Sequence, residues 1–411
     1  MTHNKSERGQ ALVLIVFAIV ALIGLTGLAI DGGNAYSDRR NAQNAADTAA
    51  LAAALSKVQG ASATTWESVG AQRAQSNGYS IDGTSSWVLP CTDSNTYCGT
   101  YAGNAEYLQV QITSHVKTYF ARVLGFNEFV NVVTAIAHTT PSVIAPYYNG
   151  AAIVGLAQTG CDTVNFAGNS QLQIWGTGIF SNSNSNCGLD IQGSTSVQTY
   201  NAGITTVASG YTTNGNPSVD TYGYGITGNA SQQPYPPPNL PNPVCTGSAT
   251  KSGSTMSGGT YSGTFPPSGV TTLQSGIYCV TGDFVMNGGQ TLTGSNVVIV
   301  LENGAIQWNG NSQVNISAPT SGPFAGLLIY SPVSNTNTMQ INGSSNSSLT
   351  GTVLLPGANI VVNGNNSQLQ KVNSQLIGYT VTLSGSSDTQ IQMDMTNQYQ
   401  FTTAPTIQLT R

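Results

Sequence analysis

Charged side chains are scarce in this chain of 411 residues. Asp, Glu, Lys and Arg make up 7% of it, against roughly 25% in an ordinary globular domain. Eleven Lys and Arg against 16 Asp and Glu, with a net charge of −5, cannot form the basic face that a nucleic acid requires. The chain has three His and no Cys-x-x-Cys pair, so a metal site is not expected. We expect no nucleic-acid partner, no metal and no cofactor.

Small polar residues take the place of the missing charges. Gly accounts for 47 residues, and Ser, Thr, Asn and Gln recur along the whole chain. The composition is not that of a disordered protein, because Leu, Ile, Val, Tyr and Phe are also spread throughout and the net charge is small. Such a chain favours a β architecture in a secreted or surface-displayed protein.

One long apolar run lies near the N-terminus. Ala11 to Ile30 (ALVLIVFAIVALIGLTGLAI) contains no charge, and as a helix it would span about 30 Å, the thickness of a hydrocarbon core. Lys5 and Arg8 precede it and Asp31 follows it. The positive-inside rule therefore predicts a cytoplasmic N-terminus, with the rest of the chain outside.

The alternative is a cleaved signal peptide, with Gly27 to Ala29 as the cleavage site. A retained anchor is favoured because signal peptides usually carry only about 7–15 apolar residues. The segment after Gly33, up to Val58, is rich in alanine and contains no Pro or Gly, so it predicts a helix. Its alanine face would pack against the same domain or against a neighbouring subunit.

Residues 8–54 combine Arg-Gly before an apolar helix, Asp31-x-Gly33 at its end, Tyr36, and Gln-Asn-Ala-Ala-Asp before an alanine-rich helix. In these features the segment resembles the N-terminal domain of the TadE/TadG-like proteins of Flp (tight-adherence) pilus assembly. Peptidase-processed pseudopilins carry Glu five residues past the cleaved Gly, where this chain has Leu14. The resemblance therefore implies a permanently anchored protein of the TadG kind, with Tad pilus or secretion components as partners.

We expect three domains: residues 1–58 as anchor and helix, 59–145 as a small α+β domain, and 146–411 as a β domain. In the second, 107–113 and 130–137 have strand patterns, and 117–124 has a helical pattern ending at Gly125. The strand–helix–strand passage also resembles TadG-like proteins.

Six cysteines in an exported chain favour disulfides. Six allow fifteen pairings, of which the pairing of neighbours is preferred for proximity alone. The candidates are Cys91, Cys98, Cys161, Cys187, Cys245 and Cys279.

The third domain repeats a plan of an apolar residue, a polar residue with Gly, small amides or hydroxyls, and an alternating strand. The repeats lie at 166–174, 191–199, 286–294, 308–316, 341–349, 362–370 and 383–391. Glycine spacings of 22, 33, 21 and 21 (288→310→343→364→385) indicate a solenoid. We expect a right-handed parallel β-helix, with a β-sandwich of hairpins as the alternative. Corner amides at Asn287, Asn309, Asn342 and Asn363 would stack as a ladder.

Six of the 17 prolines lie in 232–244, which predicts an extended segment. It either links two β blocks or loops out of one solenoid, and we expect the loop. The whole region resembles the β-solenoid tail of many TadG-like proteins.

The expected function is that of a membrane-anchored, surface-exposed structural protein in Flp-type pilus assembly or adhesion, or of a surface protein that uses this anchor without a pilus. The alternative is a β-helix that binds or cleaves polysaccharide. Cleavage needs clustered carboxylates, but the acids after residue 151 are scattered, with only Asp388 and Asp394 close in sequence. We therefore expect no enzyme. The aromatic residues of this region are compatible with a sugar-stacking platform or with stacking in the solenoid: Tyr147, Tyr148, Trp175, Tyr222, Tyr224, Tyr235 and Trp308.

Overall fold

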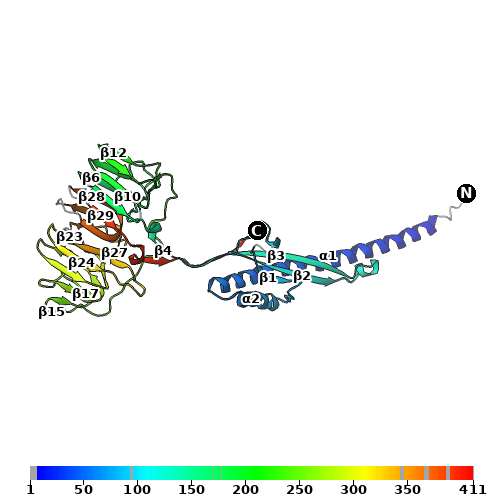
Figure 1. The fold of residues 1–411 in the computed structure, drawn as a ribbon. Coiled ribbons are helices and arrows are strands. Elements are labelled where there is room, and N and C mark those ends of the chain that lie inside the picture. Colours follow the sequence, from blue (N-terminus) through cyan, green and yellow to red (C-terminus); the bar gives the residue numbers. More distant parts are fainter. Residues whose placement is uncertain are drawn as a thin grey trace. The chain divides into compact units, whose positions relative to one another are not determined.

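The chain forms two compact units (Figure 1). The computed structural model describes residues 7–92, 96–169, 171–176, 178–342, 347–364, 370–385 and 389–410. Unit 1 consists of Met1–Val143 and Thr403–Arg411, and unit 2 consists of Ile144–Thr402.

Unit 1 packs two helices against an antiparallel sheet. The helices are α1 (Glu7–Val58) and α2 (Ala63–Ser76), and the sheet has the order β1 (Trp87–Pro90), β2 (Tyr107–Lys117), β3 (Glu128–Thr140) and β31 (Thr406–Thr410). Both expected strands are confirmed. The helical pattern at 117–124 yields only the 3-10 turn η2 (Ala121–Leu124), ended by Gly125 at φ 94°.

The last strand of the sheet comes from the C-terminus. β31 pairs with β3, with Thr410 opposite Ile136 and Thr406 opposite Thr140. The β domain expected at 146–411 is therefore too long at its C-terminal end, because pairing between segments some 270 residues apart leaves no local pattern.

The alanine face of α1 lies inside unit 1. Its seven buried alanines are at most 1% exposed and pack with Trp66 of α2 and with buried residues of β1, β2 and β3: Ala42, Ala45, Ala46, Ala49, Ala50, Ala53 and Ala54. Of the two possibilities left open by the sequence, the face packs within its own domain.

Unit 2 is a stack of short strands. Its first block contains β5 (Ile153–Gly155), β6 (Val164–Gly168), β7 (Gln171–Trp175), β8 (Ile179–Ser181), β9 (Leu189–Gly193), β10 (Ser196–Tyr200), β11 (Ile204–Thr206), β12 (Thr212–Gly215), β13 (Ser218–Asp220) and β14 (Ile226–Thr227). Its second block contains β15 (Lys251–Ser252), β16 (Thr255–Met256), β17 (Gly259–Tyr261), β18 (Thr272–Leu273), β19 (Gly276–Val280), β20 (Phe284–Met286), β21 (Thr291–Gly294), β22 (Val297–Leu301), β23 (Ile306–Trp308), β24 (Gln313–Ser317), β25 (Leu327–Tyr330), β26 (Thr338–Ile341), β27 (Ser348–Gly364), β28 (Gln370–Gly385) and β29 (Thr389–Gln392). The antiparallel pair β4 (Ile144–Pro146) and β30 (Gln400–Thr402) lies where the chain enters and leaves.

Successive coils pair in parallel, so unit 2 is a β-solenoid rather than a β-sandwich. Inward Val, Ile, Leu and Phe side chains form one continuous core, and each coil pairs its backbone with the coils on both sides. At the corners, Asn309 donates to Asn287 through their side-chain amides (3.2 Å), and the Asn363 N–H donates to Asn342 Oδ1 (3.3 Å). Residues 343–346, 365–369 and 386–388, which include parts of three repeats and Asp388, lie outside the described residues.

The order of the coils in space differs from their order in sequence. One face of the stack runs β17, β19, β22, β25, β27, β28, β5, β8, β11 and β14. Leu376 of β28 lies opposite Val353 of β27 on one side and Ile153 of β5 on the other. The last coil is thus seated on the first, and both chain connections leave from the middle of the stack, where the red strands lie beside the green ones in Figure 1.

The proline-rich segment connects the two outer ends of the stack of coils. The Ala230 N–H donates to Thr206 O, the Tyr235 hydroxyl donates to Pro356 O (3.3 Å), and Cys245 is bonded to Cys279. This strap, residues 230–245, crosses about seven coil steps of about 4.8 Å, or about 34 Å, which its fifteen residue-to-residue steps of about 3.1 Å each can span. The expectation of a loop out of the solenoid is wrong: the strap lies along it and joins its two blocks.

Buried amides hold the joint between the first and last coils. The Gln375 side chain donates to Tyr147 O (3.1 Å) and Ala151 O (2.9 Å), and Gln398 Oε1 accepts from the Gln375 N–H and from the Thr352 hydroxyl. All three polar side chains are at most 2% exposed. Satisfied polar groups at such depth fix one arrangement, because any slip would leave them unpaired.

Candidate functional site

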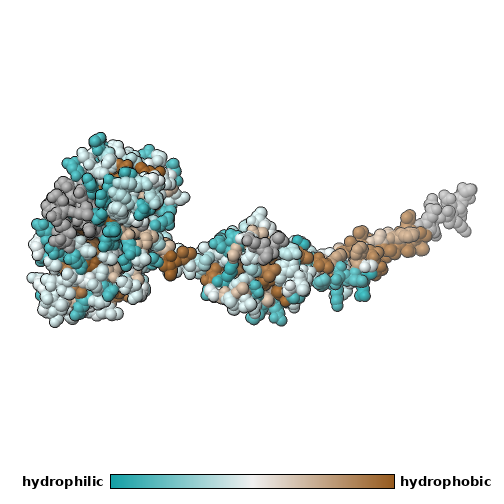
Figure 2. Space-filling model, viewed as in Figure 1, coloured by the Kyte–Doolittle hydropathy of each residue, from teal (hydrophilic) through white to brown (hydrophobic). Residues whose placement is uncertain are grey.

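The apolar segment of α1 is uncovered. Every Leu, Ile, Val and Phe from Leu12 to Ile30 is at least 45% exposed, and this stretch is the brown helix in Figure 2. Among the described residues, α1 is the one helix that is long and apolar enough to cross a membrane. The predicted ends of the anchor, Ala11 and Ile30, both lie within it. Such a surface needs an apolar environment.

Asp31, directly after the apolar segment, binds a loop of the sheet. Its carboxylate, only 2% exposed, accepts the backbone N–H groups of Tyr119 (2.9 Å), Phe120 (2.9 Å) and Ala121 (2.7 Å). Burial alone raises the pKa of an acid, but these donors stabilise the anion more, so the pKa of Asp31 lies below its ordinary value. The sequence indicated Asp31 as the charge that ends the apolar run and as part of a family motif. Its hydrogen-bond partners, about 90 residues away, were not predictable.

Asp38 holds α1 two turns further on. It accepts from the Tyr79 hydroxyl (3.0 Å), the Ser114 hydroxyl (3.1 Å) and the Asn131 amide (2.8 Å). Burial of Tyr79, together with its hydrogen bond to Asp38 and the negative charge of Asp38, raises the pKa of Tyr79 to about 12. Asp31 and Asp38 together fix the register of α1 on the sheet.

All six cysteines form disulfides between neighbours in sequence: Cys91–Cys98, Cys161–Cys187 and Cys245–Cys279. Their Cα separations of 5.6, 4.6 and 5.9 Å are those of ordinary disulfides. Within the described part of the chain no three His, Cys, Asp or Glu side chains lie close enough together to hold a metal ion.

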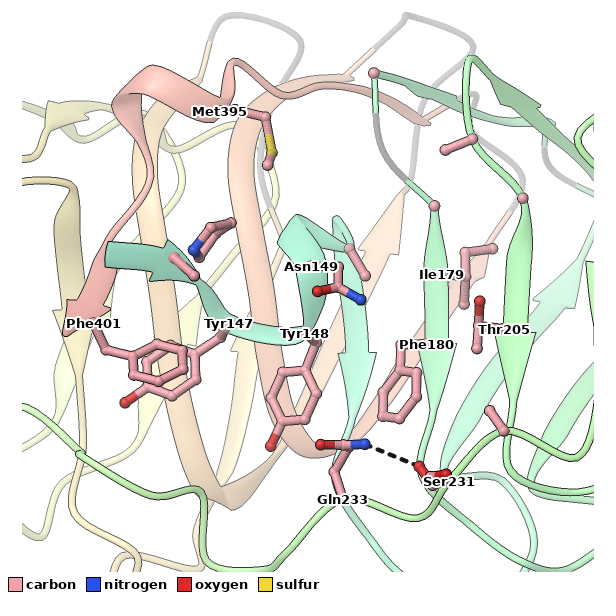
Figure 3. A pocket seen from close by; sticks show the side chains of 18 of the residues that line it. Tyr147, Tyr148, Asn149, Ile179, Phe180, Thr205, Ser231, Gln233, Met395 and Phe401 are labelled. Carbon is pink, nitrogen blue, oxygen red and sulfur yellow. Dashed lines mark hydrogen bonds between the residues drawn. The ribbon is translucent and has the colours of Figure 1, made fainter. Parts of the chain in front are cut away.

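A cavity of about 650 Å³ opens in unit 2 beside the strap and the segment by which the chain enters the solenoid. Figure 3 shows Tyr148, Asn149, Phe180 and Gln233 around it. None of the described residues that line it is Asp, Glu, Lys, Arg or His. The lining offers aromatic rings, amides and hydroxyls, which suit a neutral polar ligand.

Tyr148 is the unusual residue of this pocket. Tyr148 and Asn149 adopt left-handed backbone conformations, with φ 52° and 53°, a costly state for a bulky residue that is often found at functional sites. The Tyr148 ring stacks on Phe180 at 5.2 Å. Its buried hydroxyl has no hydrogen-bond partner among the described residues, and burial raises the pKa of Tyr148. The Gln233 amide nearby donates to Ser231 O (3.0 Å), the dashed line in Figure 3.

Four other aromatic residues of unit 2 pack within the solenoid or along it. Trp308 is buried in the core, and Trp175, Tyr200 and Tyr222 stack in a ladder with ring centroids 3.9 and 4.4 Å apart. The ring faces between these residues are covered by one another and are closed to a sugar, whereas Tyr222 at the end of the ladder is 49% exposed. Of the aromatic residues considered from sequence, Tyr147 and Tyr148 line the pocket.

Comparison with known protein families finds a match for the N-terminal region. Residues 9–57 match the family described as "Putative Flp pilus-assembly TadE/G-like". The matched segment lies in α1, so the N-terminal part of this chain is a TadE/G-like Flp pilus-assembly domain. Neither the curated proteins nor the solved structures contain a match.

Proposed function

We propose that this protein is a permanently membrane-anchored structural component of a TadE/TadG-like system, acting in Flp-type pilus assembly or in adhesion beside the pilus. The observation that carries the proposal is the match of residues 9–57 to the pilus-assembly family, on a helix whose apolar segment is uncovered. Tad pilus or secretion components and the lipid bilayer are the proposed partners.

In this proposal the N-terminus is cytoplasmic and both units lie outside. Lys5 and Arg8 before the apolar segment favour this orientation. The three disulfides support it, because disulfides persist in oxidising compartments.

A structural rather than catalytic role fits the solenoid. The cavity beside the strap has no carboxylate among its described lining residues, and glycoside chemistry needs a pair of them.

Two experiments test the proposal. In fractionated cells, mass spectrometry should find the intact N-terminus in the membrane fraction, and a membrane-impermeant amine reagent applied to intact cells should label Lys251 but not Lys5. Deletion of the gene should reduce Flp pili counted by electron microscopy, and the full chain should restore them. A new N-terminus near Ala29, soluble protein, labelling of Lys5 or unchanged pili would each contradict the corresponding part.

The pocket favours a second function, the binding of a neutral surface polysaccharide. Its support is the unpartnered Tyr148 hydroxyl beside amides and rings in an uncharged cavity. Calorimetry with neutral oligosaccharides should give binding to the full chain that Tyr148→Phe weakens about tenfold, as loss of one well-placed hydrogen bond would. Tyr224→Phe, at an exposed site that is not in the pocket lining, is the matched control. Equal binding by the two variants would remove the pocket from the function.

A further inference from the structure

The loop that joins β2 to β3 carries a group of exposed apolar side chains. In this tip loop, residues 118–127, the exposed fractions are 67% for Tyr119, 44% for Phe120, 85% for Val123, 69% for Leu124 and 60% for Phe126. Its one charged residue is Arg122. Apolar side chains gathered at a loop tip mark an interaction surface, because water is a poor environment for them.

The loop is ordered by its own hydrogen bonds. The Thr118 N–H donates to Asn127 O (3.1 Å), the Thr118 hydroxyl donates to Phe126 O, and the Gly125 N–H donates to Arg122 O (3.0 Å). The apolar residues are therefore presented by a closed turn.

The contacts of α1 show where the tip loop lies. Along the sheet, Gln43 of α1 donates to Thr134 O, Asp38 accepts from Ser114 and Asn131, and Asp31 accepts from residues 119–121. Contacts closer to the N-terminus of α1 thus fall closer to the tip. In Figure 1 the loop lies beside α1 at the end of the sheet nearer the N-terminus.

The tip reaches into the level of the apolar segment. A Cβ atom at Gly27 would lie 2.6 Å from Phe120 Cγ, so the ring sits directly against this glycine. Gly27 is four residues before Asp31, or about 6 Å along a helix axis. Phe120 is therefore about one helical turn inside the segment that begins at Ala11 and ends at Ile30.

We propose that the tip loop is a second membrane contact, inserted among the lipid headgroups and upper acyl chains of the outer leaflet beside α1. The occupant of its apolar surface is lipid because the surface continues that of the membrane-spanning segment at the same depth. A depth of about 5–10 Å is that of interfacial segments in general, and Tyr119 and Arg122 suit the headgroup level. With two contacts, unit 1 would be held in one orientation on the membrane surface. The inference rests on the proposed anchoring by α1.

The test is quenching of tryptophan fluorescence by brominated lipid. The full chain is reconstituted in phosphatidylcholine vesicles whose acyl chains carry bromine either near the headgroup or near the chain end, and its native emission is subtracted. Leu124→Trp reports on the loop, and Val123→Trp is a second reporter at an exposed site. Leu22→Trp reports on the span, and Leu409→Trp, 38% exposed on the last strand, is the matched control outside the membrane.

The expected result is a loss of Leu124→Trp and Val123→Trp emission that is greater with bromine near the headgroup than near the chain end. Leu22→Trp should be quenched, and Leu409→Trp should not. Quenching of Leu22→Trp without quenching of either loop reporter would overturn the loop insertion and leave the anchor intact. Absence of quenching at Leu22→Trp would overturn the anchor itself.

Discussion

Leu376→Ala tests whether the two blocks of the solenoid form one cooperative stack. Leu376 is 2% exposed and lies between Val353 of the second block and Ile153 of the first. A buried Leu→Ala change costs about 2–5 kcal/mol, depending on how far the site collapses. Hydrogen-bonded coils on both sides resist collapse here, so we expect about 4 kcal/mol.

The assay is hydrogen–deuterium exchange of the full chain at increasing guanidinium chloride. Peptides from β5–β11 and from β19–β25 should lose protection at the same concentration, because coupled neighbours unfold together. With a denaturant dependence of about 6 kcal/mol per M, a loss of about 4 kcal/mol lowers both midpoints by about 0.7 M. The control Leu376→Met keeps the volume and should cost less than about 1.5 kcal/mol. Different midpoints for the two blocks in the parent chain, or a shift confined to one block in Leu376→Ala, would refute the continuous stack.

Three further outcomes are expected. Replacing Cys245 and Cys279 together by Ala removes a disulfide that closes a loop of sequence separation 34, and by chain entropy this should lower the free energy of unfolding by about 3.8 kcal/mol. The measurement is the denaturation midpoint of unit 2, and an unchanged midpoint would show that the strap is held without the disulfide. The Ser85 hydroxyl and the backbone N–H groups of residues 84–86 donate to the Asp82 carboxylate and hold its pKa below the ordinary value, as the N–H groups of residues 119–121 do for Asp31. Both carboxylates therefore stabilise unit 1 above pH 3.8, the ordinary pKa, and this stability is lost as the pH falls through the folded pKa values. Near-UV circular dichroism should show an acid transition that Asp31→Asn and Asp82→Asn flatten, and identical acid curves would contradict this expectation. Tyr148→Phe removes a buried hydroxyl that has no partner among the described residues, so the ligand-free protein should be as stable as the parent or up to about 2 kcal/mol more stable. A clear loss of stability would mean that the hydroxyl is hydrogen-bonded in the folded protein.

The spanning helix and its alanine face could be predicted from the local sequence pattern. A run of uncharged residues ending at Asp31 predicts a spanning helix, and an alanine stripe predicts close helix packing, because both follow from periodicity and side-chain size. The partners of Asp31 were not predictable, because the N–H groups of residues 119–121 reach it only once β2 and β3 have folded against α1.

The solenoid, too, could be predicted from local pattern, but the order of its coils could not. Glycine spacing near 21 and β-branched strands predict a parallel solenoid, since every coil needs the same corner and the same inward face. A column of glycines crosses the joint between the last coil and the first: Gly215, Gly193, Gly168 and Gly385. A Cβ atom on any of the first three would collide with the backbone of the next glycine in the column, so these positions require glycine. The repeat pattern itself gives no order to the coils.

By itself, the sequence determined the kinds of element in this protein: an apolar helix that needs lipid, an alanine face that needs a close neighbour, paired cysteines and stackable coils. Only the tertiary structure decided which coil meets which. Gln375 bonds Tyr147 O across 228 residues, and Leu376 seats the last coil on the first. The physical reason is that parallel coils of similar shape can stack in several orders, and the order is chosen by the length of the strap, the buried amides at the joint and the chain connections, which act only when the whole stack has formed.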